Sequence, residues 1–233
     1  MFDPKQILYE DNHLMVVNKR AGELVQPDRQ GTSALEDEVK IFLRIRDNKP
    51  GQVFLGVVHR VDRPVSGAVL FAKTSKALAR LNEMMKERDF RKTYWAITEK
   101  SPEPVEGTLA HHIVRDGKTN RSRCVPKPTA ESKEARLNYR LIGTSDRYSL
   151  IEIELLTGRH HQIRCQLSRM GWPIKGDLKY GASRSNTNGG IALHARSLEF
   201  VHPVRKEPIK VIAPVPREDN LWGYFEDTQR GNP

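Results

Sequence analysis

Residues 53–73 read VFLGVVHRVDRPVSGAVLFAK, with two compact apolar runs on either side of a polar loop. The runs 53–58 and 67–73 are short and β-branched, which is typical of buried strands. The loop that joins them, HRVDRPVSG at 59–67, places one carboxylate, Asp62, between Arg60 and Arg63. The stretch therefore predicts two strands of a sheet and a charged loop between them.

The segments around this stretch add further strands and three helices. Apolar residues at helical spacing predict a helix over 34–46, with Ser33 and Glu36 as a capping box. A second helix is expected after a cap at Thr74 or Ser75, and a third over 161–171, with Ile163, Leu167 and Met170 facing inward and Gly171 as its stop. Further strands are expected at 13–19, 90–98, 137–143, 148–156, 192–203 and 208–214.

The order of these elements decides the fold class. Strands outnumber helices, 137–143 and 148–156 read as an antiparallel pair, and there is no regular βαβ alternation. We therefore expect an α+β fold with a mixed, mainly antiparallel sheet flanked by helices. In strand 90–98 the alternation puts Tyr94 on the same face as Lys92.

Composition narrows the class of protein. The chain has 233 residues, of which 37% are hydrophobic, and no run approaches the roughly 18 apolar residues of a membrane helix. The start MFDPKQ has neither the basic nor the apolar region of a secretory signal. Cys124 and Cys165 lack the paired spacing of a zinc site, which indicates reduced thiols in a cytoplasm. We expect a cytoplasmic protein with no membrane partner.

The formal net charge of +10 favours a polyanionic partner, most often nucleic acid. The cations are concentrated between residues 115 and 140, a segment that includes Arg121, Arg123 and Lys127 and carries few acids. This segment reads as a surface that faces phosphates.

Asp62 allows two interpretations. Arginine is always protonated, so a neighbouring guanidinium lowers the pKa of an aspartate and keeps it anionic. An anionic carboxylate can act as a covalent nucleophile, but most turns of this composition are ordinary ion pairs.

The stretch TGRHHQIR at 157–164 gathers Arg159, two histidines and Arg164 between a strand and a helix, and reads as an anion site or a capped loop. Adjacent histidines without a nearby acid make a metal site a weak interpretation. Tyr94 beside cations is either a stacking surface for a base or a half-buried strand residue. Asp177, in GDLKYG at 176–181, has no second acid beside it and is read as structural.

The order of these motifs is more specific than any one of them. Asn18-Lys19 before a glycine turn is followed by HRVDRPVSG, RKTYWAI, LLTGRHHQIRCQL, GDLKYG and LHARSLEFVHP. From about residue 7 to about 214, this order resembles the RluA family of RNA pseudouridine synthases. The resemblance implies the fold of that family with a central catalytic cleft, and an isomerase that converts uridine in ribosomal or transfer RNA to pseudouridine. It also implies a reaction without cofactor or metal, and a monomer.

The resemblance also assigns residues. Asp62 matches the catalytic aspartate, Tyr94 the tyrosine that packs on the target ring, and Arg164 the arginine that pairs with the catalytic carboxylate. Arg60 matches the side chain that helps to displace the target nucleotide, and Lys19 matches the lysine of the first motif, which we expect among the RNA-binding residues. Arg159, Arg121 and Arg123 are expected to contact RNA as well.

The same resemblance predicts one catalytic domain over 1–216 without a separate N-terminal RNA-binding module. The polar composition of residues 217–233 predicts a loosely attached tail. The chain departs from the family pattern at Val61, Val65 and Arg20, which we expect to alter loop packing or substrate. Two rival functions stay open: an RNA-binding protein that has lost catalysis, and a metal-dependent nuclease or phosphoesterase, although the clustered carboxylates that the latter class needs are not evident.

Overall fold

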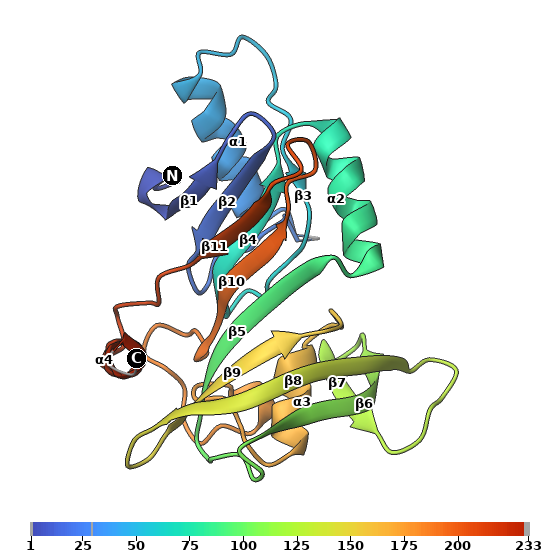
Figure 1. Cartoon of the computed structure of the whole chain (residues 1–233), viewed down its shortest axis with the longest axis vertical. Helices are drawn as coiled ribbons and strands as arrows, with labels where there is room; N and C mark the ends of the chain where they lie inside the picture. Colours follow the sequence, from blue (N-terminus) through green and yellow to red (C-terminus); the bar gives the residue numbers. More distant parts are fainter. Residues whose placement is uncertain (1, 29, 231–233) are drawn as a thin grey trace. The chain divides into compact units, whose positions relative to one another are not determined.

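The computed structural model describes residues 2–28 and 30–230. The chain divides into two compact units, Met1–Arg91 with Ala195–Pro214 and Lys92–His194 with Val215–Pro233. Each unit combines two separated stretches, where the sequence predicted a single domain over 1–216. In Figure 1 the late strands β10 and β11 accordingly lie beside the N-terminal strands. None of the helices in the described part of the chain has the length and apolar character needed to cross a membrane.

The first unit is a sheet in the order β1-β2-β4-β10, in which β3 also pairs with β4 and β11 with β10. Its elements are η1 (Pro4–Gln6), β1 (Ile7–Glu10), β2 (Leu14–Lys19), α1 (Leu35–Arg46), β3 (Gly56–Val57), β4 (Ser66–Ala72), α2 (Ser75–Glu87), β10 (Leu193–Val201) and β11 (Pro208–Ile212). β2 and β4 pair antiparallel from Leu14↔Ala72 to Lys19↔Gly67. Every residue of β4 is buried, as its continuous apolar run predicts.

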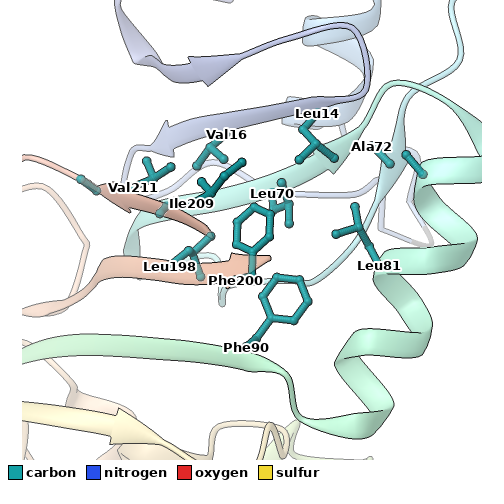
Figure 2. Packing of buried hydrophobic residues seen from close by; sticks show 13 residues of the cluster. Leu14, Val16, Leu70, Ala72, Leu81, Phe90, Leu198, Phe200, Ile209 and Val211 are labelled. Carbon is teal, nitrogen blue, oxygen red and sulfur yellow. The ribbon is translucent and has the colours of Figure 1, made fainter. Parts of the chain in front are cut away.

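The core of this unit lies between its sheet and α2 (Figure 2). Ala77 and Leu81 of α2 pack with Leu70 of β4 in one buried cluster. The rings of Phe90 and Phe200 are stacked in the same cluster, with their centroids 4.9 Å apart. The ends of β2 and β4 are therefore fixed by a continuous apolar core.

The second unit contains a sheet in the order β5-β9-β8-β6-β7. Its elements are β5 (Phe90–Thr98), β6 (Glu106–Asp116), β7 (Arg121–Val125), β8 (Lys133–Thr144), β9 (Ser149–Leu155), α3 (Gln162–Arg169), η2 (Leu178–Tyr180) and α4 (Asn220–Arg230). All four neighbouring pairs of this sheet are antiparallel. The predicted α+β class with a mainly antiparallel sheet is confirmed.

Local details depart from the sequence reading. The capping box at Ser33 is wrong: Ala34 is the N-cap and makes no side-chain capping bond. The first N–H groups of α1 donate instead to the carbonyls of Leu24 and Val25, so a neighbouring segment replaces the missing cap. Met170 is also more exposed than predicted, because α3 ends at Arg169.

The predicted loose tail is wrong as well. Residues 220–230 form α4, in which Trp222 and Phe225 are buried and the Gln229 side chain donates to the Ile142 carbonyl of β8. Its polar composition concealed two large apolar side chains on one face. The strands β6 and β7 were not predicted, because their polar alternation resembles that of an exposed basic segment.

Candidate active site

The loop between β3 and β4 carries Asp62 and is fastened to an earlier turn of the chain. The Gly22 N–H donates to the Arg63 carbonyl over 2.8 Å, and the Arg63 Nε donates back to the Gly22 carbonyl over 3.0 Å. The Val65 N–H closes a turn by donating to the Asp62 carbonyl over 3.0 Å. Asp62 is thus half-buried on a fixed backbone, whereas Arg60 is exposed.

Lys19, the last residue of β2, fastens the same loop from inside the first unit. Its side chain is 0% exposed, and its ammonium donates to the carbonyls of Arg20, Glu23 and Arg63 over 2.9, 2.8 and 3.1 Å. Burial lowers the pKa of Lys19 to about 8, and the negative charges of Glu23 and Asp62 oppose that shift. Lys19 therefore stays protonated at pH 7, with one N–H for each of the three carbonyls.

This placement corrects one sequence prediction. Lys19 was expected among the RNA-binding residues, but a fully buried ammonium whose donors serve backbone carbonyls does not reach a ligand in this structure. Lys19 instead fixes the path of the loop that carries Asp62.

Gly67 ends that loop and begins the paired part of β4. Its φ is +114°, and a Cβ placed on it would lie 2.4 Å from the Ala195 carbonyl oxygen. Only glycine combines this backbone conformation with such a close approach of two strands. The glycine of the Ser-Gly pair in the motif is thus required by backbone packing in the first unit.

In the second unit, the Arg164 guanidinium on α3 is held by a carboxylate. Its Nε donates to Asp177 Oδ2 over 2.7 Å and its Nη2 donates to Asp177 Oδ1 over 2.9 Å. The Arg164 side chain is 5% exposed and that of Asp177 1%. The guanidinium also lies over the Tyr180 ring, 4.9 Å from its centroid. This bidentate contact fixes the plane and direction of the group.

Sequence reasoning found Arg164 but missed Asp177 as its partner. Asp177 was read as structural because it lacks a second acid, which is the criterion for a metal site. The signal that could have identified the pair is that a buried acid requires a cation, and Arg164 lies in the nearby predicted helix over 161–171. Tyr180, three residues after Asp177, belongs to the same arrangement.

A neutral histidine, His161, also contacts Tyr180. The Tyr180 hydroxyl accepts the Ser122 N–H over 2.7 Å, so its own proton is available to His161 Nδ1, 2.9 Å away. Burial, reinforced by the positive charge of Arg164, lowers the pKa of His161 to about 2. His160 stacks on His161 with 3.8 Å between ring centroids. The histidine pair of TGRHHQIR is therefore structural support around Arg164, with His161 uncharged at pH 7.

Tyr94 lies in β5 opposite Ile153 of β9, and its side chain is buried. Lys92, two residues earlier on the same face, is partly buried, and burial lowers its pKa. The predicted pairing of a tyrosine and a lysine on one strand face is thus consistent with the register of β5.

Arg159 precedes α3 and is turned toward β8. Its Nε donates to the Glu134 carbonyl over 2.8 Å, and its backbone N–H donates to the Gln162 side chain over 3.0 Å. It is partly exposed, so the prediction that it contacts RNA stays a prediction.

The exposed Arg121 and Arg123 lie in β7 on a particular face of the second sheet. Residues that are partners across two strands lie on the same face of the sheet. The partners of Tyr94, followed through β9 and β8 to β6 and then along β6 in steps of two residues, lead to Ser122 and Cys124 of β7, so these two lie on the face of Tyr94. Arg121 and Arg123 alternate with these residues, so they project from the face opposite that of Tyr94. The basic segment of the sequence is therefore divided between two faces.

The predicted residues form one group in each unit: Lys19, Arg60 and Asp62 in the first, and Tyr94, Arg159 and Arg164 in the second. In the described part of the chain, no three His, Cys, Asp or Glu side chains are grouped so that they could hold a metal ion.

Comparison with known proteins places both groups within one match. A family model described as RNA pseudouridylate synthase matches residues 13–169, a range that includes Asp62, Tyr94 and Arg164. An uncharacterized RNA pseudouridine synthase of Synechocystis sp. is 36% identical over 220 residues, which cover 91% of this chain and 66% of that protein. A protein of Xylella fastidiosa named ribosomal large subunit pseudouridine synthase D is 35% identical, over 92% of this chain and 67% of its own length. The chain thus spans about two thirds of these relatives.

Solved structures agree on the fold. Human RNA pseudouridylate synthase domain containing 4 superposes with a TM-score of 0.78 at 24% identity, covering 97% of this chain and 93% of that one. Human RNA pseudouridylate synthase domain containing 1 gives a TM-score of 0.69 at 23% identity, over 96% of this chain and 86% of that one.

Proposed function

Because the chain belongs to the family of RNA pseudouridine synthases, a family of isomerases that act on RNA, we propose that it isomerises specific uridines in structured RNA to pseudouridine. The observation that carries this proposal is the family match over residues 13–169, which contains the Asp62 loop, Tyr94 and the TGRHHQIR motif. The relative named for the ribosomal large subunit favours ribosomal RNA over transfer RNA as the first substrate to test.

The reaction breaks the N-glycosidic bond of a uridine, turns the uracil and joins its C5 to the ribose. In our proposal Asp62 starts it, either by attacking C1′ or by removing the 2′ proton, without cofactor or metal. A carboxylate has to be ionised and correctly placed for either route. The support for this role is structural order: Lys19, Gly22 and Gly67 fix the backbone on both sides of Asp62.

The other residues would prepare the uridine. A stacked uridine has to leave its stack before its sugar is accessible, which costs a few kcal/mol. We propose that the exposed Arg60 helps to displace the nucleotide and that Tyr94 packs on the target ring. Arg164 is proposed to act on the same nucleotide as Asp62, and its fixed guanidinium plane suits a role in which direction matters.

One assay separates the proposal from its rivals. The protein is incubated, with EDTA present, with unmodified ribosomal and transfer RNA transcripts that carry tritium at uridine C5. Release of tritium supports the synthase, because C5 loses its hydrogen when it joins the ribose. Tight binding without release supports an RNA-binding protein that has lost catalysis. Strand cleavage that EDTA abolishes supports a nuclease.

The variant Asp62→Asn tests the assigned residue. We expect it to fold and to bind RNA with unchanged affinity but to release no tritium, and turnover near wild type would remove Asp62 from this role. A double-mutant cycle of Asp62→Glu, which keeps a carboxylate and a measurable rate, with Arg164→Lys then measures whether the two side chains act together. Effects on the rate that simply multiply would contradict a shared step.

A further inference from the structure

The two cysteines, 41 residues apart in the sequence, meet inside the second unit. Cys124 lies in β7 and Cys165 in α3, and their sulfur atoms are 3.4 Å apart. Both are free thiols. A disulfide requires the sulfurs to approach to about 2.05 Å, a movement of little more than 1 Å from their present positions.

The two thiols differ in access. Cys165 is 4% exposed and packs with Ile113, Ala135 and Tyr180 in a buried cluster. Cys124 borders this cluster, is only half-buried and belongs to β7, the last strand in the order of the second unit's sheet. A small oxidant from solvent therefore reaches Cys124 before Cys165.

The pKa values of the two thiols are also shifted in opposite directions. The hydrogen bond from Cys165 lowers the pKa of the Cys124 thiol, against the effect of burial, and the positive charge of Arg169 adds to the lowering. The same hydrogen bond, together with burial, raises the pKa of Cys165. A cysteine whose pKa is lowered by an adjacent thiol and a neighbouring cation is typical of a redox-sensitive cysteine with a resolving partner.

We propose that Cys124 and Cys165 form a peroxide-sensitive pair, in which Cys124 is oxidised first and Cys165 resolves it to a disulfide between β7 and α3. The Cys124 thiolate attacks one oxygen of hydrogen peroxide, the O–O bond breaks, and the leaving hydroxide takes a proton to become water. The Cys165 sulfur then attacks the Cys124 sulfenic acid, its proton leaves with the hydroxyl group as a second water, and the S–S bond forms. Peroxide accepts both electrons.

The wild-type protein, reduced and then freed of reductant, is treated with hydrogen peroxide at pH 7 and analysed by intact mass and by peptide mapping. We expect a loss of about 2 Da, a cross-linked pair of peptides containing Cys124 and Cys165, and oxidation at least about five-fold faster than that of N-acetylcysteine. The same oxidation in denaturant serves as the control and should fall to the rate of N-acetylcysteine. A folded protein that reacts no faster, or that gains oxygen without cross-linking, would overturn the proposal.

Single variants assign the two roles. Cys165→Ser should stop at a sulfenic acid on Cys124, which dimedone traps, while Cys124→Ser should react no faster than N-acetylcysteine. The opposite result, with Cys165 oxidised first, would overturn the assignment. Because each variant leaves one thiol in place, the pair serves as its own matched control.

The disulfide has a consequence that rests on the proposed function. Cys165 follows Arg164 on α3, and a displacement of about 1 Å at a positioned group can cost up to about 10²-fold in rate. We expect the oxidised protein to release tritium at least about ten-fold more slowly than the reduced protein, and dithiothreitol to restore the rate. The rate of the double variant Cys124→Ser/Cys165→Ser should not change when peroxide is added. A double variant that is inhibited equally would refute this consequence. Absence of release from reduced wild type would count against the proposed function instead.

Discussion

Each unit buries one cation from the predicted site, and the two are satisfied in different ways. Lys19 in the first unit donates to three backbone carbonyls. Arg164 in the second unit donates two parallel bonds to the Asp177 carboxylate and covers the Tyr180 ring. A lysine bound to carbonyls fixes the path of a loop, whereas an arginine bound to a carboxylate has its own plane fixed. Lys19 therefore supports the loop of the site, whereas Arg164 has the fixed orientation that a residue acting on a substrate needs.

The two cations should therefore respond differently when their partners are changed. Removing the partner of a buried charge is more costly than removing one donor from a set of neutral acceptors. All three tryptophans, at positions 95, 172 and 222, lie in the second unit, so their fluorescence follows the unfolding of that unit. Circular dichroism follows both units, and together the two signals assign a loss of stability to one of them.

The largest effect is expected from Asp177→Asn. It removes the negative charge that the Arg164 guanidinium, buried at 5% exposure, contacts through two parallel hydrogen bonds, so the free energy of unfolding should fall by about 3–5 kcal/mol. Urea denaturation followed by tryptophan fluorescence measures this. The exposed Asp146→Asn, also in the second unit, is the matched control and should change the free energy by less than about 0.5 kcal/mol.

Asp177→Asn also tests the function of the arginine. If Arg164 acts in the proposed reaction, the variant should lose about 10²-fold in kcat with a much smaller change in KM, since binding of the rest of the RNA is untouched. The assay is run well below the variant's unfolding temperature. A variant with lowered stability but wild-type kcat would show that Asp177 is only structural.

A smaller loss is expected from Lys19→Met, which keeps the apolar stem and removes the three donors. The carbonyls of Arg20, Glu23 and Arg63 are left without their common partner, and we expect the free energy of unfolding to fall by about 2–3 kcal/mol. The loss should appear in circular dichroism more than in tryptophan fluorescence. Lys76→Met, at an exposed position of α2, is the control. An equal loss in both variants would contradict the role of Lys19 in the loop.

The sequence predicted the elements that have strong periodicity. β5 was predicted with its observed limits, and α1 and β4 to within one residue, because helical spacing and continuous apolar runs are local signals. α4 and the strands β6 and β7 were missed for the converse reason. Their apolar residues are few, and what stabilises them is a tertiary surface, as when Phe225 packs beside Gly143.

For the site, the sequence indicated which residues take part and in which order, but not how buried they are or which groups they contact. That Lys19 is buried and that Asp177 holds Arg164 follow from tertiary contacts between segments 13 or more residues apart. Charge in a motif indicates that a partner exists, but it does not say whether the partner is a ligand, a carbonyl or a carboxylate. The roles of Asp62 and Tyr94 came from the resemblance and are still to be tested.

A fourth prediction concerns the neutral histidine beside Arg164. His161 has a folded pKa of about 2, so below its ordinary value of 6.5 only the unfolded chain takes up the extra proton. Stability therefore falls as pH falls through 6.5, by about 1.2 kcal/mol between pH 7 and pH 5.5 from this group alone. His161→Asn, which tolerates the positive φ of 52°, should lose that much less over the same range. Identical slopes for variant and wild type would mean that His161 is not kept neutral by the fold.

The smallest effect on stability is expected at the exposed cations, which contrast with the two buried ones. Reversing Arg121, Arg123 and Lys127 to glutamate should change the free energy of unfolding by less than about 0.5 kcal/mol. If these residues bind RNA, the slope of log affinity against log salt should fall by about one for each phosphate that the variant no longer neutralises, measured between about 50 and 200 mM salt.

Arg115 makes this experiment decisive for the face that RNA uses. It lies opposite Ser122, so it shares the face of Tyr94, while Arg121 and Arg123 project from the other face. A loss of salt dependence in Arg115→Glu alone would show that phosphates follow the face of Tyr94 and would contradict the assignment of Arg121 and Arg123. A loss only in the triple reversal would mean that RNA also extends onto the opposite face, since the target base must still reach Tyr94. Unchanged affinity in both variants would mean that none of these four cations has a role in RNA binding.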